Sequence, residues 1–464
     1  MMDTFLRLTR EQEIGANSYW IGDKKNGLVL DAGMHPKQYG GEAMPNYKLL
    51  NSLPVDAAVV SHSHLDHIGT LPYLLQQYPK IEAYLTNATM KLGEALLHNS
   101  VNVMTSQRLE LGITEYPLFT HEEIDIAMDQ LHPVKYNKTF KVSDYPDCKL
   151  TFYDAGHLLG SACVLIETPN KKILYSGDIQ LEDQTLIPKC SISDPKAIEA
   201  LKDIDTLIVE TTRGASPRNP NYTREREEKR LSQAIQRSLN LGGAVLIPVF
   251  AMGKTQEVLM MLHNFFESGL LQKAPVKIGG LSTKMTRIFD ELADSTPRKY
   301  PEFSLLEAHN IKGTPRHKRS RKREPLVTQP GHIYVMSSGM MVPKTLSNQL
   351  AESLLPNSKN GLFFVGYCDP ETPGYAIQQT PLKESVSLGT GRPRVARLCQ
   401  IEAFDFSGHC ERDSLKQWIV DLAPKQVLLV HGDLDASAWF EKELKKDLPN
   451  STIITPEAGT PYPL

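Results

Sequence analysis

Four side chains that commonly bind metals lie within one short segment, directly after an apolar run. The segment Val59–His67 reads VVSHSHLDH and contains His62, His64, Asp66 and His67. In an extended chain, residues i and i+2 point the same way, so His62 and His64 can share one ion. The chain must then turn, and Asp66 and His67 can reach a second ion. Imidazole and carboxylate groups suit zinc, and also manganese or iron.

Other polar residues recur at the same kind of position, immediately or shortly after an apolar strand. In open α/β sheets, ligands bind beyond the carboxyl ends of the strands. Chance would scatter such residues over both ends of the sheet, so we expect them to meet at one edge. They are Asp31, His62, His157, Asp178, Glu210 and His431.

The elements that position these residues follow from the hydrophobic pattern. Short apolar runs alternate with longer amphipathic segments, which is typical of a layered α/β fold, and 464 residues suit two to three domains. The expected strands are Leu28–Leu30, Ala57–Val60, Leu150–Tyr153, Ala162–Glu167, Lys172–Ser176, Thr206–Val209, Ala244–Val249, Ile333–Met336, Leu362–Val365, Ile401–Phe404 and Val427–Val430. The expected helices include Pro72–Gln77, Thr89–Ser106, Arg224–Leu239, Thr255–Glu267 and Ser437–Lys446.

Charge gives no sign that the molecule as a whole binds nucleic acid. The formal net charge is -3, so a site for a polyanion must be a local patch or a metal centre. One basic run exists: Lys312–Arg323 has seven Lys or Arg in twelve residues. It is either a solvated loop or a contact to a phosphate backbone.

The sequence predicts a cytoplasmic protein without a membrane segment. No stretch approaches the roughly 20 apolar residues that a spanning helix needs. The N-terminal residues have no basic region followed by an apolar run, so no signal peptide is expected. The six cysteines form no C-x-x-C pair, which predicts free thiols in a reducing compartment and no cysteine zinc site.

The order H-x-H-x-D-H after a strand resembles the metallo-β-lactamase superfamily. Other motifs of that superfamily are also present, with Asp31 in LVLDAG, His157 in DAGHLLGSA and Asp178 in LYSGDI. The resemblance implies a four-layer αββα sandwich with two Zn²⁺ per chain, Mn²⁺ being the alternative. In the family pattern, His62, His64 and His157 hold one ion, Asp66, His67 and His431 hold the other, Asp178 bridges both, and Asp31 orients the ligands from behind.

A second resemblance covers the rest of the chain. After Asp178 come ETTRG, IPVFAMGKTQEVL, VMSSGMM, FVGYCDPETPG, FSGHCERDSL and LLVHGD, which resemble the β-CASP subfamily of nucleases. Its motifs A, B and C correspond to Glu210, His409 and His431. The similarity is greatest to compact bacterial and archaeal relatives of the mRNA 3′-end cleavage endonuclease. It implies a metallo-β-lactamase domain in two parts, 1–208 and 399–464, around an inserted α/β β-CASP domain at 209–398.

The subfamily resemblance implies a zinc-dependent ribonuclease that is mainly endonucleolytic on single-stranded RNA. In the mechanism that this resemblance implies, a hydroxide would bridge the two ions, which Asp66 and Asp178 help to hold. This hydroxide would attack phosphorus in line. The 3′ oxygen leaves, which gives 5′-phosphate and 3′-hydroxyl ends. His409 is the expected general acid, and Glu210 is expected to hydrogen-bond it and keep it protonated. The alternative is that His409 only binds phosphate.

Five residues are candidate contacts to phosphate or RNA. Ser337, Ser338 and Gly339 predict either a phosphate-binding loop or an ordinary tight turn. Lys254 begins a helix and is a candidate for a contact to the RNA backbone. Arg213 stands where relatives commonly have tyrosine, so a phosphate contact there replaces base stacking as the expectation.

Other functions stay open at this stage. DNA nucleases share the fold but usually lack histidine at motif C, so His431 favours RNA. An inactive scaffold in an RNA-processing complex would have lost metal ligands, whereas all seven are intact here. A thioesterase or lactonase is disfavoured because the inserted segment would narrow access to the site. These patterns fix neither the RNA target, nor endonucleolytic against 5′-exonucleolytic cleavage, nor whether the chain forms a homodimer.

Overall fold

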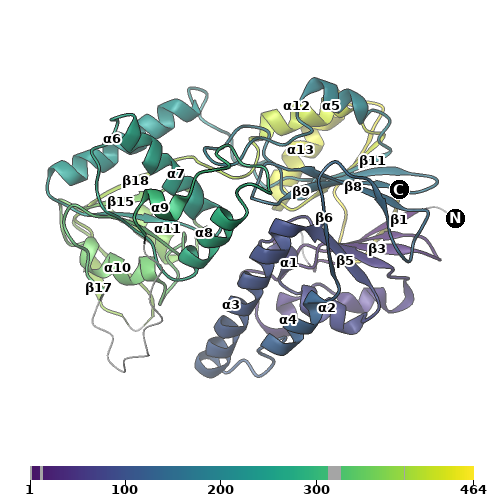
Figure 1. The fold of residues 1–464 in the computed structure, drawn as a ribbon, viewed down its shortest axis with the longest axis horizontal. Helices are drawn as coiled ribbons and strands as arrows, with labels where there is room; N and C mark the ends of the chain where they lie inside the picture. The colour runs from purple at the N-terminus through teal and green to yellow at the C-terminus, as the bar shows by residue number, and fades with distance from the viewer. Residues whose placement is uncertain (1–2, 11–13, 312–325, 391) are drawn as a thin grey trace. The chain divides into compact units, whose positions relative to one another are not determined.

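A computed structural model describes residues 3–10, 14–311, 326–390 and 392–464 (Figure 1). The chain divides into two compact units. Unit 1 consists of Met1–Arg218 and His409–Leu464, and unit 2 of Asn219–Gly408. The sequence prediction places both junctions ten residues earlier, at 208/209 and 398/399.

Unit 1 is built on two sheets, each with seven strands among the described residues. The first has the order β21-β1-β2-β3-β4-β5-β6 and the second β20-β19-β11-β10-β9-β8-β7. The first sheet consists of β1 (Thr4–Arg7), β2 (Tyr19–Gly22), β3 (Gly27–Leu30), β4 (Ala57–Val59), β5 (Glu82–Thr86), β6 (Leu131–Val134) and β21 (Pro461–Pro463). The second consists of β7 (Phe140–Lys141), β8 (Lys149–Asp154), β9 (Ala162–Glu167), β10 (Lys172–Tyr175), β11 (Thr206–Glu210), β19 (Gln426–Val430) and β20 (Thr452–Ile454).

Helices cover the outer face of each sheet, so unit 1 has four layers. Successive strand residues face opposite sides: Leu28 of β3 packs between the sheets, while Val29 packs with Leu74 on the outer face. On the outer face of the second sheet, Trp418 and Phe440 pack against the strands. Strands buried on both faces read as continuous apolar runs, which is why their positions are visible in the sequence. The predicted αββα sandwich is confirmed.

The helices of unit 1 begin and end at recognisable signals. The longest, α3 (Asn87–Leu111), begins where the Thr86 side chain accepts a hydrogen bond from the Thr89 backbone N–H, and it ends at Gly112 with φ 70°. None of the helices formed by the described residues is long and apolar enough to cross a membrane. The other helices are η1 (Gly40–Ala43), η2 (Tyr47–Ser52), α1 (Leu65–Ile68), α2 (Leu71–Gln77), α4 (His121–Met128), α5 (Pro195–Ala200), α12 (Arg412–Leu422) and α13 (Leu434–Asp447).

The strand directions bring the carboxyl ends to one edge of each sheet. In the first sheet, β3 and β4 are parallel. In the second, β10, β11 and β19 are parallel, and β8 points the same way because β9 is antiparallel to both β8 and β10. The six polar residues predicted to follow strands therefore lie at or just beyond these carboxyl ends, as the sequence analysis expects.

Unit 2 is a parallel sheet with the order β13-β14-β12-β15-β18 and helices packed against it. Its core joins Leu246, Leu362 and Leu350. Its strands are β12 (Val245–Pro248), β13 (Val276–Lys277), β14 (Ile333–Met336), β15 (Gly361–Phe364) and β18 (Gln400–Ala403), with a hairpin of β16 (Ser385–Ser387) and β17 (Arg394–Ala396). Its helices are α6 (Arg224–Asn240), α7 (Lys254–Glu267), α8 (Leu281–Glu291), α9 (Leu305–Ala308), α10 (Leu346–Leu354) and α11 (Pro373–Gln379).

Candidate active site

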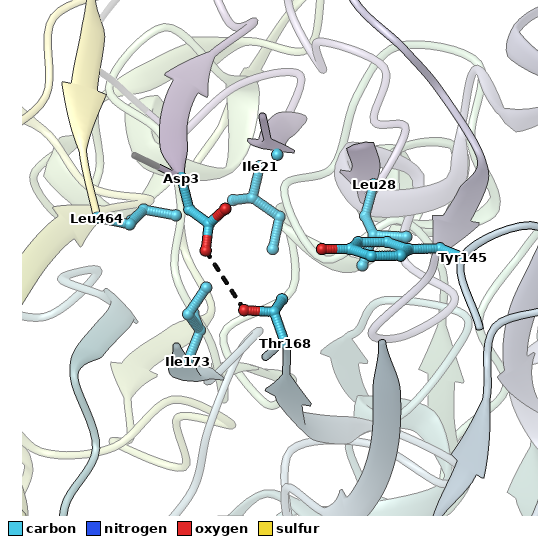
Figure 2. Close-up of a pocket in the computed structure, with 8 residues that line it drawn as sticks. Asp3, Ile21, Leu28, Tyr145, Thr168, Ile173 and Leu464 are labelled. Atoms are coloured by element: carbon cyan, nitrogen blue, oxygen red, sulfur yellow. Dashed lines mark hydrogen bonds between the residues drawn. The ribbon is translucent and has the colours of Figure 1, made fainter. Parts of the chain in front are cut away.

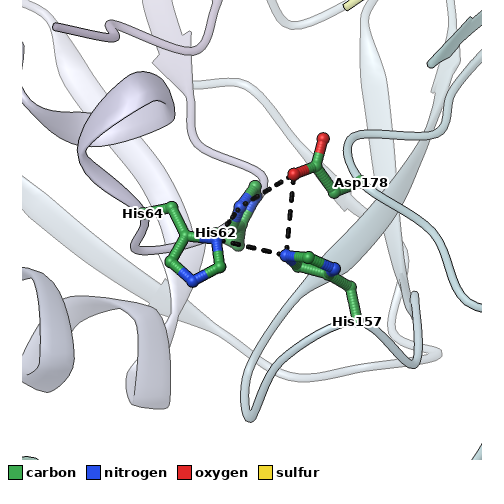
Figure 3. Close-up of side chains that lie close together, drawn as sticks. All are labelled: His62, His64, His157 and Asp178. Carbon is green, nitrogen blue, oxygen red and sulfur yellow. Dashed lines mark hydrogen bonds and ion pairs between the residues drawn. The ribbon is translucent and has the colours of Figure 1, made fainter. Parts of the chain in front are cut away.

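Three histidines and an aspartate form a first cluster at the strand ends of unit 1 (Figure 3). His62 and His64 follow β4, His157 follows β8 and Asp178 follows β10. The Nε2 atoms of His62 and His157 each lie 3.1 Å from His64 Nδ1. The same two atoms lie 3.4 and 3.6 Å from Asp178 Oδ2. Ligand atoms bound at about 2.0–2.1 Å to one tetrahedral ion stand at similar spacings from each other.

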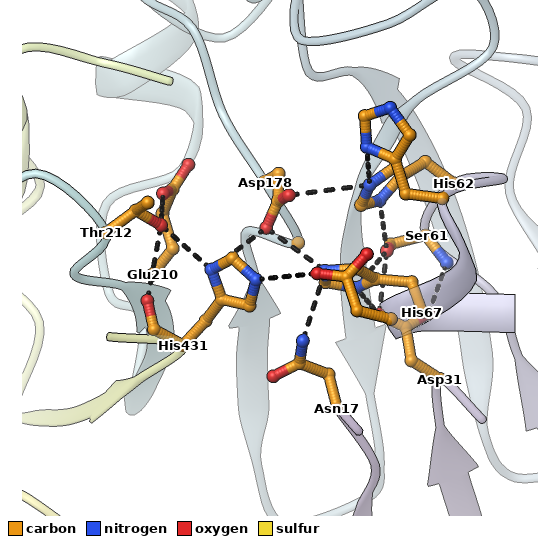
Figure 4. A network of polar contacts seen from close by, with 12 residues as sticks. Asn17, Asp31, Ser61, His62, His67, Asp178, Glu210, Thr212 and His431 are labelled. Atoms are coloured by element: carbon orange, nitrogen blue, oxygen red, sulfur yellow. Dashed lines mark hydrogen bonds and ion pairs between the residues drawn. The ribbon is translucent and has the colours of Figure 1, made fainter. Parts of the chain in front are cut away.

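Asp66, His67 and His431 form a second cluster beside the first. Asp66 and His67 lie on α1, and His431 directly follows β19. His431 Nε2 lies 3.3 Å and His67 Nε2 3.8 Å from Asp66 Oδ2. Asp178 reaches this cluster too, because its Oδ1 lies 3.3 Å from His67 Nε2 and 3.4 Å from His431 Nδ1 (Figure 4). Asp178 therefore turns one carboxylate oxygen toward each cluster.

The donor atoms of the two clusters fit a pair of cations. Asp178 Oδ1 is buried and has no hydrogen-bond partner among the described residues. A buried carboxylate oxygen without a donor is costly, and a cation between this oxygen and its neighbours would remove that cost. Seven residues offer possible ligand atoms in these two clusters, and five of them are histidines. Proteins of this fold bind divalent metal ions.

The protonation state of His62 and His64 suits metal binding. Burial lowers the pKa of His64 to about 4, and burial together with His67 lowers the pKa of His62 well below its usual value. A neutral imidazole offers the lone pair that a metal needs. Burial opposes ionisation of Asp178, but His431 and His67 outweigh it and lower the pKa of this carboxyl.

Asp31 lies behind the candidate ligands, where the sequence analysis expects it. Its carboxylate accepts hydrogen bonds from the backbone N–H and the hydroxyl of Ser61, both at 2.7 Å, and from the hydroxyl of Tyr175 at 2.5 Å. Its Oδ2 also lies 2.7 Å from His67 Nδ1. Because Nδ1 donates to Asp31, His67 presents Nε2 to the cluster, which is the arrangement of a ligand oriented by an outer carboxylate.

His409 and Glu210 form an ion pair next to the clusters. His409 Nδ1 lies 2.9 Å from Glu210 Oε2, and the ring centroid of His409 lies 4.7 Å from that of His157. Glu210 ends β11, is buried, and accepts the backbone N–H of Ile179 at 2.7 Å. Burial opposes the charged form of His409, but Glu210 and Asp178 outweigh it and raise the pKa of His409 to about 9. These two carboxylates therefore favour the protonated form of His409.

Models of three protein families match consecutive parts of the chain. Residues 23–208 match the metallo-beta-lactamase superfamily domain, residues 255–377 the Beta-Casp domain, and residues 394–456 the Zn-dependent metallo-hydrolase RNA specificity domain. The chain belongs to the β-CASP family of metallo-β-lactamase-fold proteins. The resemblance stated from the motifs is confirmed, and the two clusters lie within the parts that match the first and third models.

Named relatives of this β-CASP protein include RNA-processing proteins. Endoribonuclease ysh-1 of Neurospora crassa is 29% identical over 459 residues, and the match covers 93% of this chain and 52% of the relative. Cleavage and polyadenylation specificity factor 73 of Drosophila melanogaster is 27% identical, with coverage of 94% and 60%. The chain thus spans about half the length of several curated relatives that it matches. An RNase J-like protein of Methanocaldococcus jannaschii is 29% identical, with coverage of 98% of both chains.

A solved structure shares the fold of this β-CASP protein. A protein of unknown function from Enterococcus faecalis superimposes with a TM-score of 0.58 at 14% identity, and the match covers 100% of both chains. At this identity the likeness concerns the fold alone.

The predicted RNA contacts in unit 2 are already engaged in local hydrogen bonds. Ser338 accepts the Val342 backbone N–H at its hydroxyl, at 3.1 Å, and its carbonyl accepts from Ser347. Gly339 packs closely under Phe250, since a Cβ on this glycine would lie 3.2 Å from the Phe250 nitrogen. The stretch has the bonding of a tight turn, and a phosphate-binding role for Ser337, Ser338 and Gly339 stays a prediction.

Lys254 and Arg213 also have surroundings of their own. Lys254 begins α7, and its ammonium donates to the Phe406 carbonyl within unit 2. Burial lowers the pKa of Lys254 to about 8. Arg213 is half-buried in the turn after β11 in unit 1. Their contacts to RNA stay predictions. The basic run Lys312–Arg323 lies outside the described residues.

Four further residues contact the candidate ligands or Asp31 and are missed by the sequence analysis. Ser61 and Tyr175 lie in the quoted motifs beside His62 and Asp178, so position within a motif is a usable signal for them. Thr212 lies in ETTRG and contacts His431. Asn17 lies 3.3 Å from His67 Nε2 and belongs to no recognisable pattern.

A small hollow in unit 1 is separate from the clusters (Figure 2). Its one charged lining residue, Asp3, accepts a hydrogen bond from Thr168 at 3.3 Å. The remaining lining is mostly apolar and includes none of the predicted site residues, so we assign it no part in the chemistry. It is lined by Asp3, Ile21, Gly22, Leu28, Tyr145, Thr168, Ile173 and Leu464.

Proposed function

We propose that this protein is a metal-dependent ribonuclease that cuts internal phosphodiester bonds of single-stranded RNA. The observation that carries the proposal is Asp178, which turns one oxygen to each of two ligand clusters. Two carboxylates among seven ligands leave a net positive charge on a pair of divalent cations, which suits an anionic phosphodiester. The RNA-processing names of the relatives and the name of the matched RNA specificity domain support the substrate class.

The proposed chemistry assigns a separate task to His409. Two divalent cations bound by the seven ligands would activate water for attack on phosphorus and neutralise charge on the phosphate. His409 donates its Nδ1–H to Glu210, so a proton for the leaving 3′ oxygen comes from Nε2. Loss of the 3′ oxygen leaves 5′-phosphate and 3′-hydroxyl ends. Glu210 keeps the imidazole charged and correctly oriented.

Zinc is the proposed metal because histidines dominate the ligand set, with manganese as the alternative. All six cysteines are free and buried, as expected for a protein of a reducing compartment, and we place the enzyme in the cytoplasm. A homodimer remains a prediction that a mass measurement in solution would test.

The test compares RNA and DNA directly. Purified protein is incubated with a 5′-labelled single-stranded RNA and with a DNA oligonucleotide of the same sequence, each with and without chelator. We expect internal cuts in the RNA and no cleavage with chelator. The downstream products should be substrates for ligation, which requires a 5′-phosphate. Preferential cleavage of the DNA would make the protein a DNA nuclease of the same fold. Cleavage of neither, by protein that carries metal, would favour the inactive scaffold.

A further inference from the structure

Thr212 connects the His409–Glu210 pair to the ligand His431. It lies two residues after Glu210, just past the end of β11. Its hydroxyl donates to Glu210 Oε2, the oxygen that also accepts from His409. The same hydroxyl oxygen lies 2.8 Å from His431 Nδ1 and 3.2 Å from the His431 carbonyl oxygen (Figure 4).

The donors and acceptors of this contact fix its direction. A hydroxyl has one hydrogen, and the ionised carboxylate of Glu210 can only accept. The Thr212 hydrogen therefore goes to Glu210 or to the His431 carbonyl oxygen, which can also only accept, and the Thr212 oxygen is left to accept from Nδ1. His431 Nδ1 must then carry the hydrogen of the Nδ1···Oγ1 contact. The competing acceptor, Asp178 Oδ1, lies farther away, at 3.4 Å.

A protonated Nδ1 determines what His431 offers on its other side. Nε2 is then the nitrogen with the lone pair, and it lies 3.3 Å from Asp66 Oδ2. Neither a lone-pair nitrogen nor a carboxylate oxygen has a proton to share, so they repel each other unless a cation stands between them. The tautomer set by Thr212 is therefore the one that completes the Asp66, His67 and His431 cluster.

We propose that Thr212 is a positioning residue that holds His431 in the Nδ1-protonated tautomer and so aims Nε2 at the second metal ion. The proposal rests on the proposed function for the presence of metal at this site. One hydroxyl would then join the proton donor of the reaction to a metal ligand, through the shared oxygen Glu210 Oε2. Outer partners of metal-bound histidines typically change metal affinity or activity about 10–100-fold when removed.

The experiment compares three variants. Thr212→Val keeps the shape and removes the hydroxyl, and Thr212→Ser keeps the hydroxyl. Thr211→Val is the matched control, because the buried Thr211 hydroxyl contacts the Val430 carbonyl and Ser437 and no proposed ligand. Zinc dissociation constants are measured on metal-free protein by competition with a chromophoric chelator. Circular dichroism and thermal melts check the fold of each variant.

Thr212→Val should weaken the affinity for one of two zinc ions about 10–100-fold. The affinity for the other ion should stay within about threefold of wild type. Thr212→Ser should restore the affinity, and Thr211→Val should not alter it. The proposal is overturned if folded Thr212→Val binds zinc with wild-type affinity, or if Thr212→Ser binds zinc as weakly as Thr212→Val. It is also overturned if the wild-type protein binds no zinc. A wild type that binds two zinc ions but cuts no RNA contradicts the proposed function only, since the affinity comparison still decides the role of Thr212.

Discussion

The proposed ligands owe their orientation to neighbours that bind no metal themselves. Asp31 fixes the ring of His67, and Thr212 contacts the ring of His431. His409 differs from both, because its partner Glu210 charges the ring instead of preparing a lone pair. The atom that each imidazole ring contacts thus determines whether the ring is suited to bind metal or to donate a proton.

His409→Ala tests the proton-donating role. Metal content and RNA affinity should stay nearly unchanged, because His409 belongs to neither ligand cluster. The cleavage rate should fall roughly 10²–10⁴-fold, mainly in kcat, since the proton is needed only in the transition state. Steady-state kinetics and elemental analysis measure both. His132→Ala, a change at a partly exposed histidine on β6, serves as the control. Loss of an ion would instead make His409 a ligand, and loss of RNA affinity alone would make it a phosphate anchor.

Glu210→Gln tests whether Glu210 and His409 act as one unit. The glutamine keeps a hydrogen-bonding side chain but removes the charge, so the rate should fall by less than in His409→Ala. The double variant should be no slower than His409→Ala alone, because removing the support of an absent acid has no further effect. Additive losses in the two single-turnover rates would show that Glu210 has a task independent of His409.

Sequence reasoning identifies the candidate ligands because they come in short contiguous motifs. His62, His64, Asp66 and His67 are recognisable by spacing alone. Thr212 is different, since its contact to His431 spans 219 residues of the chain and exists only in the folded protein. Hydroxyl residues are also too common for their type alone to indicate a role.

The strands that deliver the site residues are mostly buried along their length, and sequence reasoning finds all of them. Each of the eleven predicted strands overlaps a strand of the structure. The missed strands include β1, β2 and β5 inside the first sheet and the edge strand β6, which reads LHPV and in which only Leu131 is buried. The alternation of apolar and polar residues in β6 is too weak to predict a strand. The strand forms by pairing with β5, which the sequence of β6 alone does not reveal. The helix α12 is also missed, although Glu411 caps it by accepting N–H bonds from Asp413 and Ser414.

The end of β8 makes a pH-dependent contribution to stability. Burial raises the pKa of Asp154 from 3.8 to about 7. The folded protein therefore binds this proton more tightly than the unfolded chain, so the stabilisation is complete below about pH 4 and is lost as pH rises to about 7. Asp154→Asn stays neutral and can still accept from the Gly156 N–H. Its free energy of unfolding, relative to wild type, should rise by up to ~4 kcal/mol between pH 4 and pH 8.

Urea denaturation at several pH values measures this difference. Asp147→Asn, a change at an exposed carboxyl that precedes β8, is the matched control. A constant difference between Asp154→Asn and wild type across this pH range would mean that Asp154 is ionised throughout.

Electrostatic attraction to RNA must come from a local group of positive charges or from the metal centre, because the net charge of the molecule is -3. The run Lys312–Arg323 is a dense group of positive charges in the sequence, with seven Lys or Arg in twelve residues. If it contacts phosphates, neutralising four of its charges should weaken RNA binding and flatten the salt dependence. Each lost contact to single-stranded RNA should reduce the log–log slope by about 0.7. Fluorescence anisotropy at several salt concentrations measures the slope, and an unchanged slope would make this run a solvated segment.

The most direct measurement follows metal binding and RNA cleavage in the same samples. Metal-free protein is titrated with zinc, bound zinc is determined by elemental analysis, and cleavage of end-labelled RNA is recorded at each step. Activity should rise with bound zinc and reach its limit at about two ions per chain. Asp178→Ala should bind both ions weakly and remain inactive, because Asp178 faces both clusters. Full RNA cleavage by protein without detectable metal would contradict the two-metal mechanism.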